Sequence, residues 1–257
     1  MNRLNNLEKY KKKFYQDGFC IVRKAVSKKS LSILKREINK LKKPKIKKAN
    51  EHLTKNKKVN TLHHLDKYLQ KKNSLIEFAK NKNLRELAGH ILNDDKIKLR
   101  NIELFLKPRK TGMPAPFHQD NYYWNIINNN KALNIWIACT NSSKKNGAVK
   151  YVKNSHKLGV LNHEISYAAG TSQKVSDKTI SKYKHKIVTP SLKPGDLIVH
   201  HSAVIHGSSK NLSNSDREGL TISYKTRDAK INKKKMLKYR KKVKKSNRIA
   251  KKINNIL

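Results

Sequence analysis

Acidic side chains are scarce in this sequence. Its 257 residues include 17 Asp and Glu against 61 Lys and Arg, which gives a formal net charge of +44. Residues 230–257 hold 13 of the basic residues and no acidic one, which leaves +31 of that charge on the other 229 residues. Such an even surplus favours compositional bias over one focused basic face, although the surface attracts nucleic acid, phosphates and anionic lipid. We therefore predict no specific nucleic-acid partner.

Cysteines and long apolar runs are also scarce. The two cysteines, Cys20 and Cys139, lie inside apolar runs, which favours buried thiols in a reducing compartment over a disulfide framework. The basic segment 1–13 precedes no apolar stretch that could form a signal peptide, and the longest uncharged apolar run, residues 132–140, is too short to span a bilayer. We expect a soluble, cytoplasmic protein without a transmembrane segment.

The first 93 residues have mainly the spacing of helices. Apolar side chains recur three or four residues apart, and capping residues and breakers mark the ends of the segments. The predicted elements are a helix ended by Gly18, a strand at 19–22, a helix capped by Ser27 and ended by Pro44, a surface loop to Asn60, and an amphipathic helix at 74–92.

From residue 94 onward the pattern becomes that of strands. Short apolar and β-branched runs alternate with Gly, Pro, Asn and Ser, and no helices lie between them, which indicates an antiparallel barrel or two-sheet roll. The polar segment 166–183 predicts a mobile loop or lid. The predicted strands are residues 97–106, 132–140, 147–152, 186–188, 196–201 and 220–226.

We therefore expect a mainly β fold with flanking helices. Residues 1–229 form one predicted domain, with a helical part at 1–93 and a β core at 94–229, followed by a basic helix or tail at 230–257. Apolar residues in the tail recur at helical spacing. These apolar residues would form a stripe along one side of the helix. We therefore favour a terminal helix that packs on the domain; the alternative is an arm that binds anions or membranes.

The pair His118 and Asp120 is the first candidate for chemistry. In a strand, residues two apart point to the same face, so this pair can present an imidazole and a carboxylate to one ion, with Gln119 pointing away. The pair alone is weak support in a chain with 11 histidines.

A second histidine strengthens the metal hypothesis. After the turn Pro194-Gly195-Asp196 and a strand comes His206-Gly207-Ser208, and a roll can bring this distant ring beside the first pair. Two His and one carboxylate form the facial triad of non-haem Fe(II) oxygenases, which leaves positions open for a cosubstrate and dioxygen. Zinc is more often held by a closed set of His and Cys, and neither cysteine is near these histidines in sequence.

Arg217 follows His206 by eleven residues. A guanidinium can neutralise the far carboxylate of a dicarboxylate cosubstrate with two parallel hydrogen bonds, which Lys cannot form. Taken alone, Arg217 could also be an ordinary surface cation.

The sequence resembles the phytanoyl-CoA dioxygenase family over roughly residues 14–226. The ordered set of motifs is specific, whereas each fragment alone is not. The matching segments are Phe14-Tyr15-Gln16-Asp17-Gly18-Phe19, His118-Gln119-Asp120, residues 132–138, Asn146-Gly147-Ala148, Asn154-Ser155-His156-Lys157, Pro194-Gly195-Asp196, and His206-Gly207-Ser208 with Asn211, Ser213 and Arg217.

This resemblance implies a double-stranded β-helix (jelly roll) that uses Fe(II), 2-oxoglutarate and O2. It implies that His118, Asp120 and His206 are the metal ligands. Arg217 and Ser208 would hold the distal carboxylate of 2-oxoglutarate, and Trp136 would lie in the cosubstrate pocket. Related halogenating enzymes replace the carboxylate ligand with a small residue. Because Asp120 remains here, hydroxylation is the implied outcome.

The roles of several side chains near these motifs have two interpretations. One of His200 and His201 faces inward and could orient a ligand, and Tyr122, Tyr123 and Trp124 either line the substrate pocket or simply pack. We expect a hydroxylase acting on a small molecule, and the basic surface would suit an anionic one. The alternatives are an oxygenase that acts on nucleic acid or protein and a non-catalytic basic protein that binds anionic partners. The sequence does not show the oligomeric state.

Overall fold

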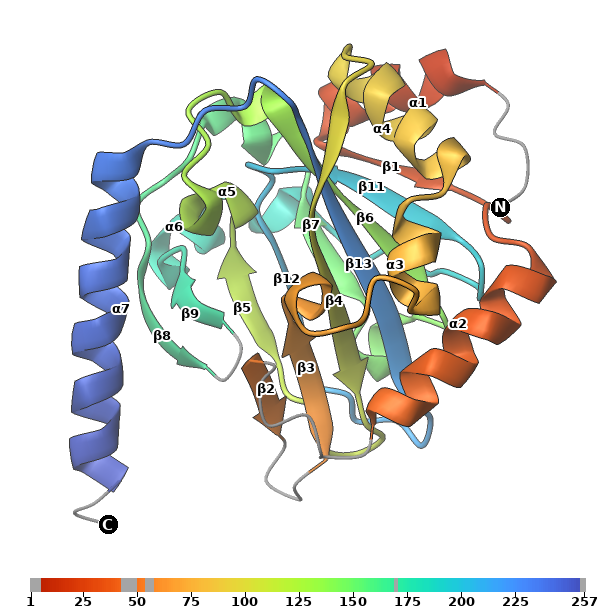
Figure 1. Ribbon diagram of the computed structural model, residues 1–257. Coiled ribbons are helices and arrows are strands. Elements are labelled where there is room, and N and C mark those ends of the chain that lie inside the picture. The colour runs from red at the N-terminus through yellow and green to blue at the C-terminus, as the bar shows by residue number, and fades with distance from the viewer. Residues whose placement is uncertain (1–5, 43–49, 54–57, 169–170, 255–257) are drawn as a thin grey trace.

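The computed structural model describes residues 6–42, 50–53, 58–168 and 171–254. Two antiparallel sheets face each other, and helices lie on the outer side of the larger one (Figure 1). The predicted mainly β architecture with flanking helices is confirmed.

The larger sheet contains seven strands, and each neighbouring pair is antiparallel. Strands far apart in the sequence therefore lie side by side. Their order across the sheet is β1 (Phe19–Val22), β11 (Leu197–His201), β6 (Ala132–Ala138), β13 (Arg217–Thr226), β4 (Ile97–Lys107), β3 (Val59–His63) and β2 (Asn50–Leu53).

The smaller sheet contains four strands, and a separate hairpin lies next to it. From β4 to β7, and again from β10 to β13, the chain alternates between the two sheets, which closes them into a roll. The smaller sheet has the order β10 (Ile187–Val188), β7 (Val149–Val152), β12 (His206–Ser208) and β5 (Ala115–His118), and the hairpin is β8 (Glu164–Ala168) with β9 (Thr171–Lys174).

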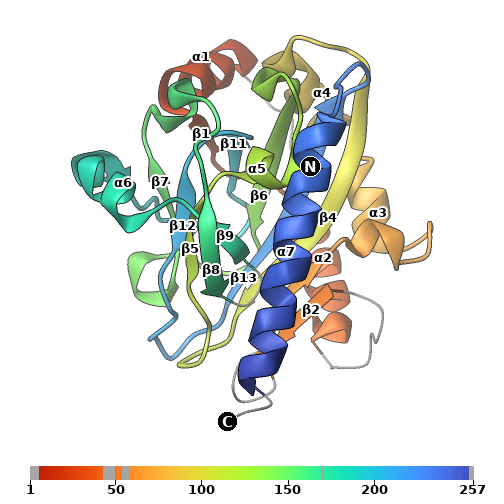
Figure 2. The ribbon, with the colours of Figure 1, turned by 90° about the vertical axis from the view of Figure 1, so that its left-hand side faces the viewer.

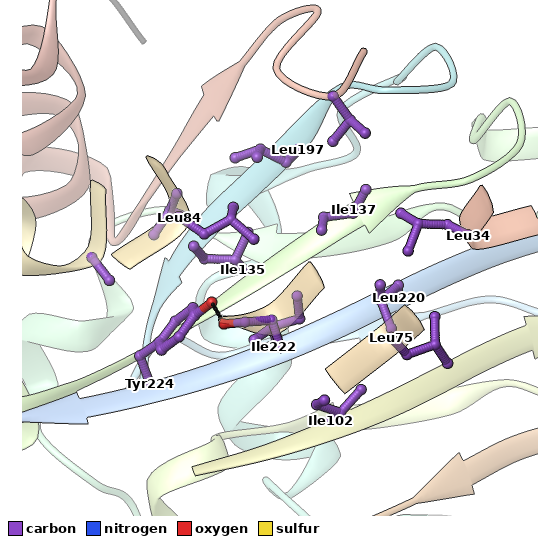
Figure 3. Packing of buried hydrophobic residues seen from close by; sticks show 14 of the residues in the cluster. Leu34, Leu75, Leu84, Ile102, Ile135, Ile137, Leu197, Leu220, Ile222 and Tyr224 are labelled. Atoms are coloured by element: carbon purple, nitrogen blue, oxygen red, sulfur yellow. Dashed lines mark hydrogen bonds between the residues drawn. The ribbon is translucent and has the colours of Figure 1, made fainter. Parts of the chain in front are cut away.

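Helices cover the outer face of the larger sheet because its outward side chains are apolar. Successive strand residues point to opposite faces, so Leu220 and Ile222 of β13 face the helices together with Ile135 of β6 (Figure 3). The Tyr224 hydroxyl donates a 2.6 Å hydrogen bond to the Ala79 carbonyl. The helices on this side are α1 (Leu7–Asp17), α2 (Lys28–Leu41), α3 (Ser74–Ala79) and α4 (Lys82–Leu92).

The inner face of the same sheet is more polar. It receives the residues that alternate with the apolar ones, and this face looks across the roll to the smaller sheet. The inward residues of the central strands are Asn134 and Trp136 on β6, Arg217, Thr221 and Ser223 on β13, and Asn101, Glu103 and Lys107 on β4.

The predicted helix-ending glycine and helix-capping serine define the ends of the first two helices. Gly18 ends α1 with φ of +87°, a left-handed conformation that glycine adopts without strain. The Ser27 side chain accepts a hydrogen bond from Ser30 N and caps α2. Pro44, predicted to end α2, lies outside the described residues, and α2 ends at Leu41.

Four predictions about secondary structure are wrong. The expectation that no helices lie between the strands after residue 94 fails, because α5 (Asp120–Trp124) and α6 (Asp177–Lys182) lie between them. The segment before Asn60 includes β2 and the start of β3, not only a loop, and 166–183 contains β9 and α6. The helix expected at 74–92 is two helices, because the Asn81 side chain accepts from Asn83 N and starts a new one. The remaining helices are α5 (Asp120–Trp124), α6 (Asp177–Lys182) and α7 (Lys233–Asn254), with 3-10 helices at Leu65–Lys67, Asn129–Lys131, Lys144–Asn146, Ser155–Leu158 and Lys184–Lys186.

The basic C-terminal segment forms the long helix α7. It runs lengthwise along one side of the molecule (Figure 2). Its Tyr239 ring contacts Tyr122 and Tyr123 edge-on, with centroids 6.0 and 5.7 Å away. The division of the chain after residue 229 stays a prediction.

The prediction that both cysteines are buried is confirmed. Cys20 and Cys139 are buried and unpaired, and burial raises the pKa of each thiol to about 12. Among the described residues, no helix has the length and apolar character needed to cross a membrane.

We expect Leu220→Ala to destabilise the fold by about 2–5 kcal/mol, because it leaves a cavity under the helices. Leu220 is fully buried in the main core. Leu212→Ala is the matched control, since Leu212 is 70% exposed, and we expect a change within about 0.5 kcal/mol. Chemical denaturation monitored by circular dichroism measures both values. Equal stability of the two variants would contradict this assignment of the core.

Candidate metal centre

His118, Asp120 and His206 converge at one point of the roll. One ligand atom from each lies within 4.8 Å of the others. β12 pairs with β5 in a register that sets His206 opposite His118. The expectation that Asp120 shares a strand with His118 is wrong, because β5 ends at His118 and Asp120 begins α5. The turn between them still brings Asp120 Oδ1 within 3.8 Å of His118 Nε2 and 3.7 Å of His206 Nε2.

Backbone carbonyls orient both imidazoles. His118 Nδ1 donates to Pro116 O at 2.7 Å, and His206 Nδ1 donates to Val204 O at 3.1 Å. Each Nε2 is left with a lone pair that faces the carboxylate. Burial lowers the pKa of His118 to about 4 and also lowers that of His206. Both rings are therefore neutral at pH 7, which is the form that binds metals.

The Asp120 carboxylate is held on one side only. Its Oδ2 accepts hydrogen bonds from His200 Nε2 at 3.0 Å and Asn134 Nδ2 at 2.5 Å. Burial raises the pKa of Asp120, but His206 and the His200 hydrogen bond outweigh burial and hold this pKa well below its usual range. Oδ1 of an ionised carboxylate is thus the atom turned toward the imidazoles.

A further layer fixes the two partners of Asp120. The Tyr151 hydroxyl donates to His200 Nδ1 at 3.1 Å, and Ser223 Oγ donates to Asn134 Oδ1. His200 is therefore the inward histidine of its pair, whereas His201 contacts Asn130. Sequence reasoning missed Asn134. Its signal is a single amide inside an otherwise apolar strand.

Arg217 lies inside the protein and is not a surface cation. It is 1% exposed, and its guanidinium carbon is 5.4 Å from the Trp136 ring centroid. Nη1 donates to Phe105 O at 3.3 Å, but Nε has no hydrogen-bond partner among the described residues. Burial lowers its pKa to about 9, so the group stays charged at pH 7. A buried cation with an unused donor suits a carboxylate ligand.

A buried lysine, which sequence reasoning missed, lies opposite Arg217. Lys107 on β4 is the cross-strand partner of Arg217, and burial lowers its pKa, with Arg217 adding to the effect. Its Nζ donates to Met113 O and, at 2.7 Å, to Ser209 O, next to the buried Ser208. This end of the roll therefore attracts an anion. No local motif marks Lys107 among so many lysines.

The aromatic residues after Asp120 have different surroundings. The Tyr123 ring is 5.8 Å from the His118 ring, edge to face, and Tyr122 stacks on His163 at 4.0 Å. Both lie beside the candidate metal centre. Trp124 instead packs in a separate apolar cluster, with the Arg100 guanidinium 4.2 Å above its ring.

Known proteins share this sequence pattern. The model of the family described as "Phytanoyl-CoA dioxygenase (PhyH)" matches residues 14–219. Phytanoyl-CoA dioxygenase of Arabidopsis thaliana is 28% identical over 71% of this chain and 59% of its own length. A probable alpha-ketoglutarate-dependent hypophosphite dioxygenase of Stutzerimonas stutzeri is 27% identical over 61% of this chain and 54% of its own length. The matched part thus spans little more than half of these relatives.

Solved structures share the fold. EctD from S. alaskensis, solved with 2-oxoglutarate and 5-hydroxyectoine, has a TM-score of 0.73 and 18% identity, covering 87% of this chain and 77% of its own. The alpha-ketoglutarate-dependent epimerase SnoN from nogalamycin biosynthesis has a TM-score of 0.68 and 17% identity, covering 86% and 82%. At this identity the likeness shows the fold alone, and it confirms the predicted jelly roll.

Proposed function

Because this chain belongs to the phytanoyl-CoA dioxygenase family, we propose that it is an Fe(II)- and 2-oxoglutarate-dependent dioxygenase that hydroxylates an unactivated carbon of a small molecule. The main support is the convergence of two neutral imidazoles and one singly held carboxylate. Two His and one carboxylate are the donor set of non-haem Fe(II) oxygenases, and the set leaves coordination positions open.

Iron(II) fits the residues present. His118 Nε2, His206 Nε2 and Asp120 Oδ1 would hold the metal, since each has a lone pair directed at the same point. His200 and Asn134 keep Oδ2 engaged, which leaves a single oxygen of the carboxylate for the metal. Both cysteines are far outside this donor set, because each is packed in the core on the helix side of the larger sheet.

2-Oxoglutarate fits the buried cationic end of the roll. Arg217 would bind its distal carboxylate, with Nε available for one of the hydrogen bonds. Ser208 and Lys107 would lie near the same carboxylate, and Trp136 would line the pocket beside Arg217. The full burial of Arg217 excludes water from this end and strengthens its attraction for the dianion.

When bound, Fe(II) and 2-oxoglutarate supply the activation of dioxygen that oxidises a carbon–hydrogen bond, with release of succinate and CO2. The protein's own residues hold the carboxylate ligand in position. Tyr151 fixes His200 and Ser223 fixes Asn134, and His200 and Asn134 in turn fix Asp120. Because Asp120 keeps its place in the ligand set, a halide has no vacant position there, and hydroxylation is the proposed outcome.

Oxygen-dependent succinate production tests the proposed function. Purified protein with Fe(II), ascorbate and 2-oxoglutarate should release succinate slowly even without substrate. Chelation of the metal should stop the release, and Fe(II) should restore it. Binding of 2-oxoglutarate without any succinate in air would instead support the non-catalytic alternative.

We expect His200→Ala to weaken Fe(II) binding by about 10–100-fold, because removing a partner of a metal ligand frees that ligand to rotate. His200 Nε2 donates to Asp120 Oδ2 at 3.0 Å. His185→Ala is the control, since His185 is exposed. Anaerobic Fe(II) titration of both variants measures the change. An Fe(II) affinity equal to that of the wild type in His200→Ala would show that His200 has no part in the site.

A further inference from the structure

A second carboxylate, most of it shielded from solvent, faces the inside of the roll. Glu103 on β4 points to the inner face, since its neighbours Ile102 and Leu104 point into the core under the helices. Its side chain is 15% exposed, and its Oε1 lies 2.8 Å from His63 Nδ1. Acids are few in this chain, 17 against 61 bases. An inward carboxylate that is not a proposed metal ligand is therefore a candidate for binding another group inside the roll.

The strand register places Glu103 relative to the candidate metal centre. Thr221 on β13 pairs with Glu103 on one side and with Trp136 on the other. Two residues further along β13, Ser223 pairs in the same way with Asn101 and Asn134. Asn134 donates to Asp120. Adjacent strands are about 4.8 Å apart, so Glu103 lies about 10 Å across the sheet from Trp136. A small molecule can span that width.

Electrostatic interactions agree with this placement. The negative charge of Asp120 acts on Glu103, and that of Glu103 acts on His118. Burial raises the pKa of Glu103, but His63 and His64 outweigh it and hold the pKa below its usual value. Glu103 is thus ionised at pH 7 and shares the interior with the metal centre.

Two buried acceptors next to Glu103 have no partner. Asn101 Oδ1 and Thr221 Oγ1 make no hydrogen bond among the described residues, and both residues are 2% exposed. A buried polar atom without a partner destabilises a protein unless a ligand forms a hydrogen bond with it. The carboxylate, the amide oxygen and the hydroxyl can all accept hydrogen bonds, so this part of the wall complements a group that donates several.

We propose that Glu103, Asn101 and Thr221 form the substrate subsite and bind a protonated amine of the substrate, with His63 as the residue that positions Glu103. This inference rests on the proposed function and specifies its substrate class. An ammonium group has three donors and no acceptor, which matches this wall. A hydrocarbon chain would leave Asn101 Oδ1 and Thr221 Oγ1 buried and unpaired, and it would offer nothing to the free oxygen of Glu103.

A matched set of probes tests the substrate class. Primary amines, alcohols and carboxylates of equal length, from propyl to octyl, are titrated calorimetrically into anaerobic protein loaded with Fe(II) and 2-oxoglutarate. We expect the amines to bind and the other two series to bind at least about tenfold more weakly. Equal binding of alcohols or carboxylates, or no binding of any amine, would contradict the proposal.

Glu103→Gln is the decisive variant, because it keeps the shape and removes the charge. We expect amine affinity to fall about tenfold or more, whereas Glu77→Gln, on an exposed ion pair, should change nothing. Thr221→Val is the second variant, in case the first folds poorly, and it should weaken amine binding several-fold. Undiminished amine affinity in the correctly folded variants would overturn the subsite.

The Fe(II)–2-oxoglutarate absorption band distinguishes a failure of the proposed subsite from a failure of the proposed function. If the band forms in the wild type and in Glu103→Gln while amine binding behaves alike in both, the subsite is wrong and the proposed function stands. If the wild type forms no band, the proposed function fails, and the subsite fails with it.

Discussion

We expect Asp120→Ala and His206→Ala each to reduce 2-oxoglutarate turnover by more than about a hundredfold. Loss of an outer partner already weakens a metal site by about 10–100-fold, and each of these variants removes a proposed ligand itself. The remaining two donors would hold Fe(II) too weakly for turnover at micromolar metal. Succinate release at fixed Fe(II), followed by titration with excess Fe(II), measures the loss and any recovery.

Asp177→Ala is the matched control for Asp120→Ala. Asp177 is 87% exposed and pairs with Lys174 at the surface, so its loss should leave turnover unchanged. Circular dichroism shows whether each variant keeps the fold. Normal turnover in a folded His206→Ala protein would mean that the metal is bound elsewhere.

The second large effect is expected at Arg217. We expect Arg217→Lys to raise the 2-oxoglutarate concentration needed for half-maximal turnover by about 10–100-fold, because an ammonium group cannot form the two parallel hydrogen bonds of a guanidinium. Fe(II) affinity without 2-oxoglutarate should be unchanged, since the guanidinium of Arg217 donates to Phe105 O and is not one of the three proposed ligands.

A shortened cosubstrate gives the specific control. 2-Oxobutanoate lacks the distal carboxylate, so it should bind the wild type and Arg217→Lys equally weakly. Arg109→Lys tests the same change at an exposed position and should behave as the wild type. An unchanged 2-oxoglutarate requirement in Arg217→Lys, with the fold intact, would rule out this arginine as the carboxylate partner.

The residues that the sequence could identify belong to short motifs. His118 and Asp120 are two apart, and His206 has its own Gly-Ser context, so each motif is visible without knowledge of the fold. Their meeting point required only that β5 and β12 be neighbours, as the smaller sheet makes them. Even here the local prediction failed in part, because Asp120 lies in a turn of helix and not on the strand.

Residues whose role depends on strand register could not be predicted. Asn134 is 14 positions from Asp120, and Lys107 faces Arg217 across a pair of strands 110 positions apart in numbering. Alternation with Ile102 and Leu104 puts Glu103 on the opposite face of β4, but only the pairing of β13 with β4 shows that Thr221 lies beside it. Periodicity gives the face of each strand but not its partner.

Anaerobic titration of the metal-free protein with Fe(II) and 2-oxoglutarate tests the central claim most directly. The account predicts a weak visible charge-transfer band that appears only when both are present, saturates at one equivalent of each, and is lost in Asp120→Ala. A wild-type protein that forms no such band at any concentration would contradict the assignment of His118, Asp120 and His206 as an iron site.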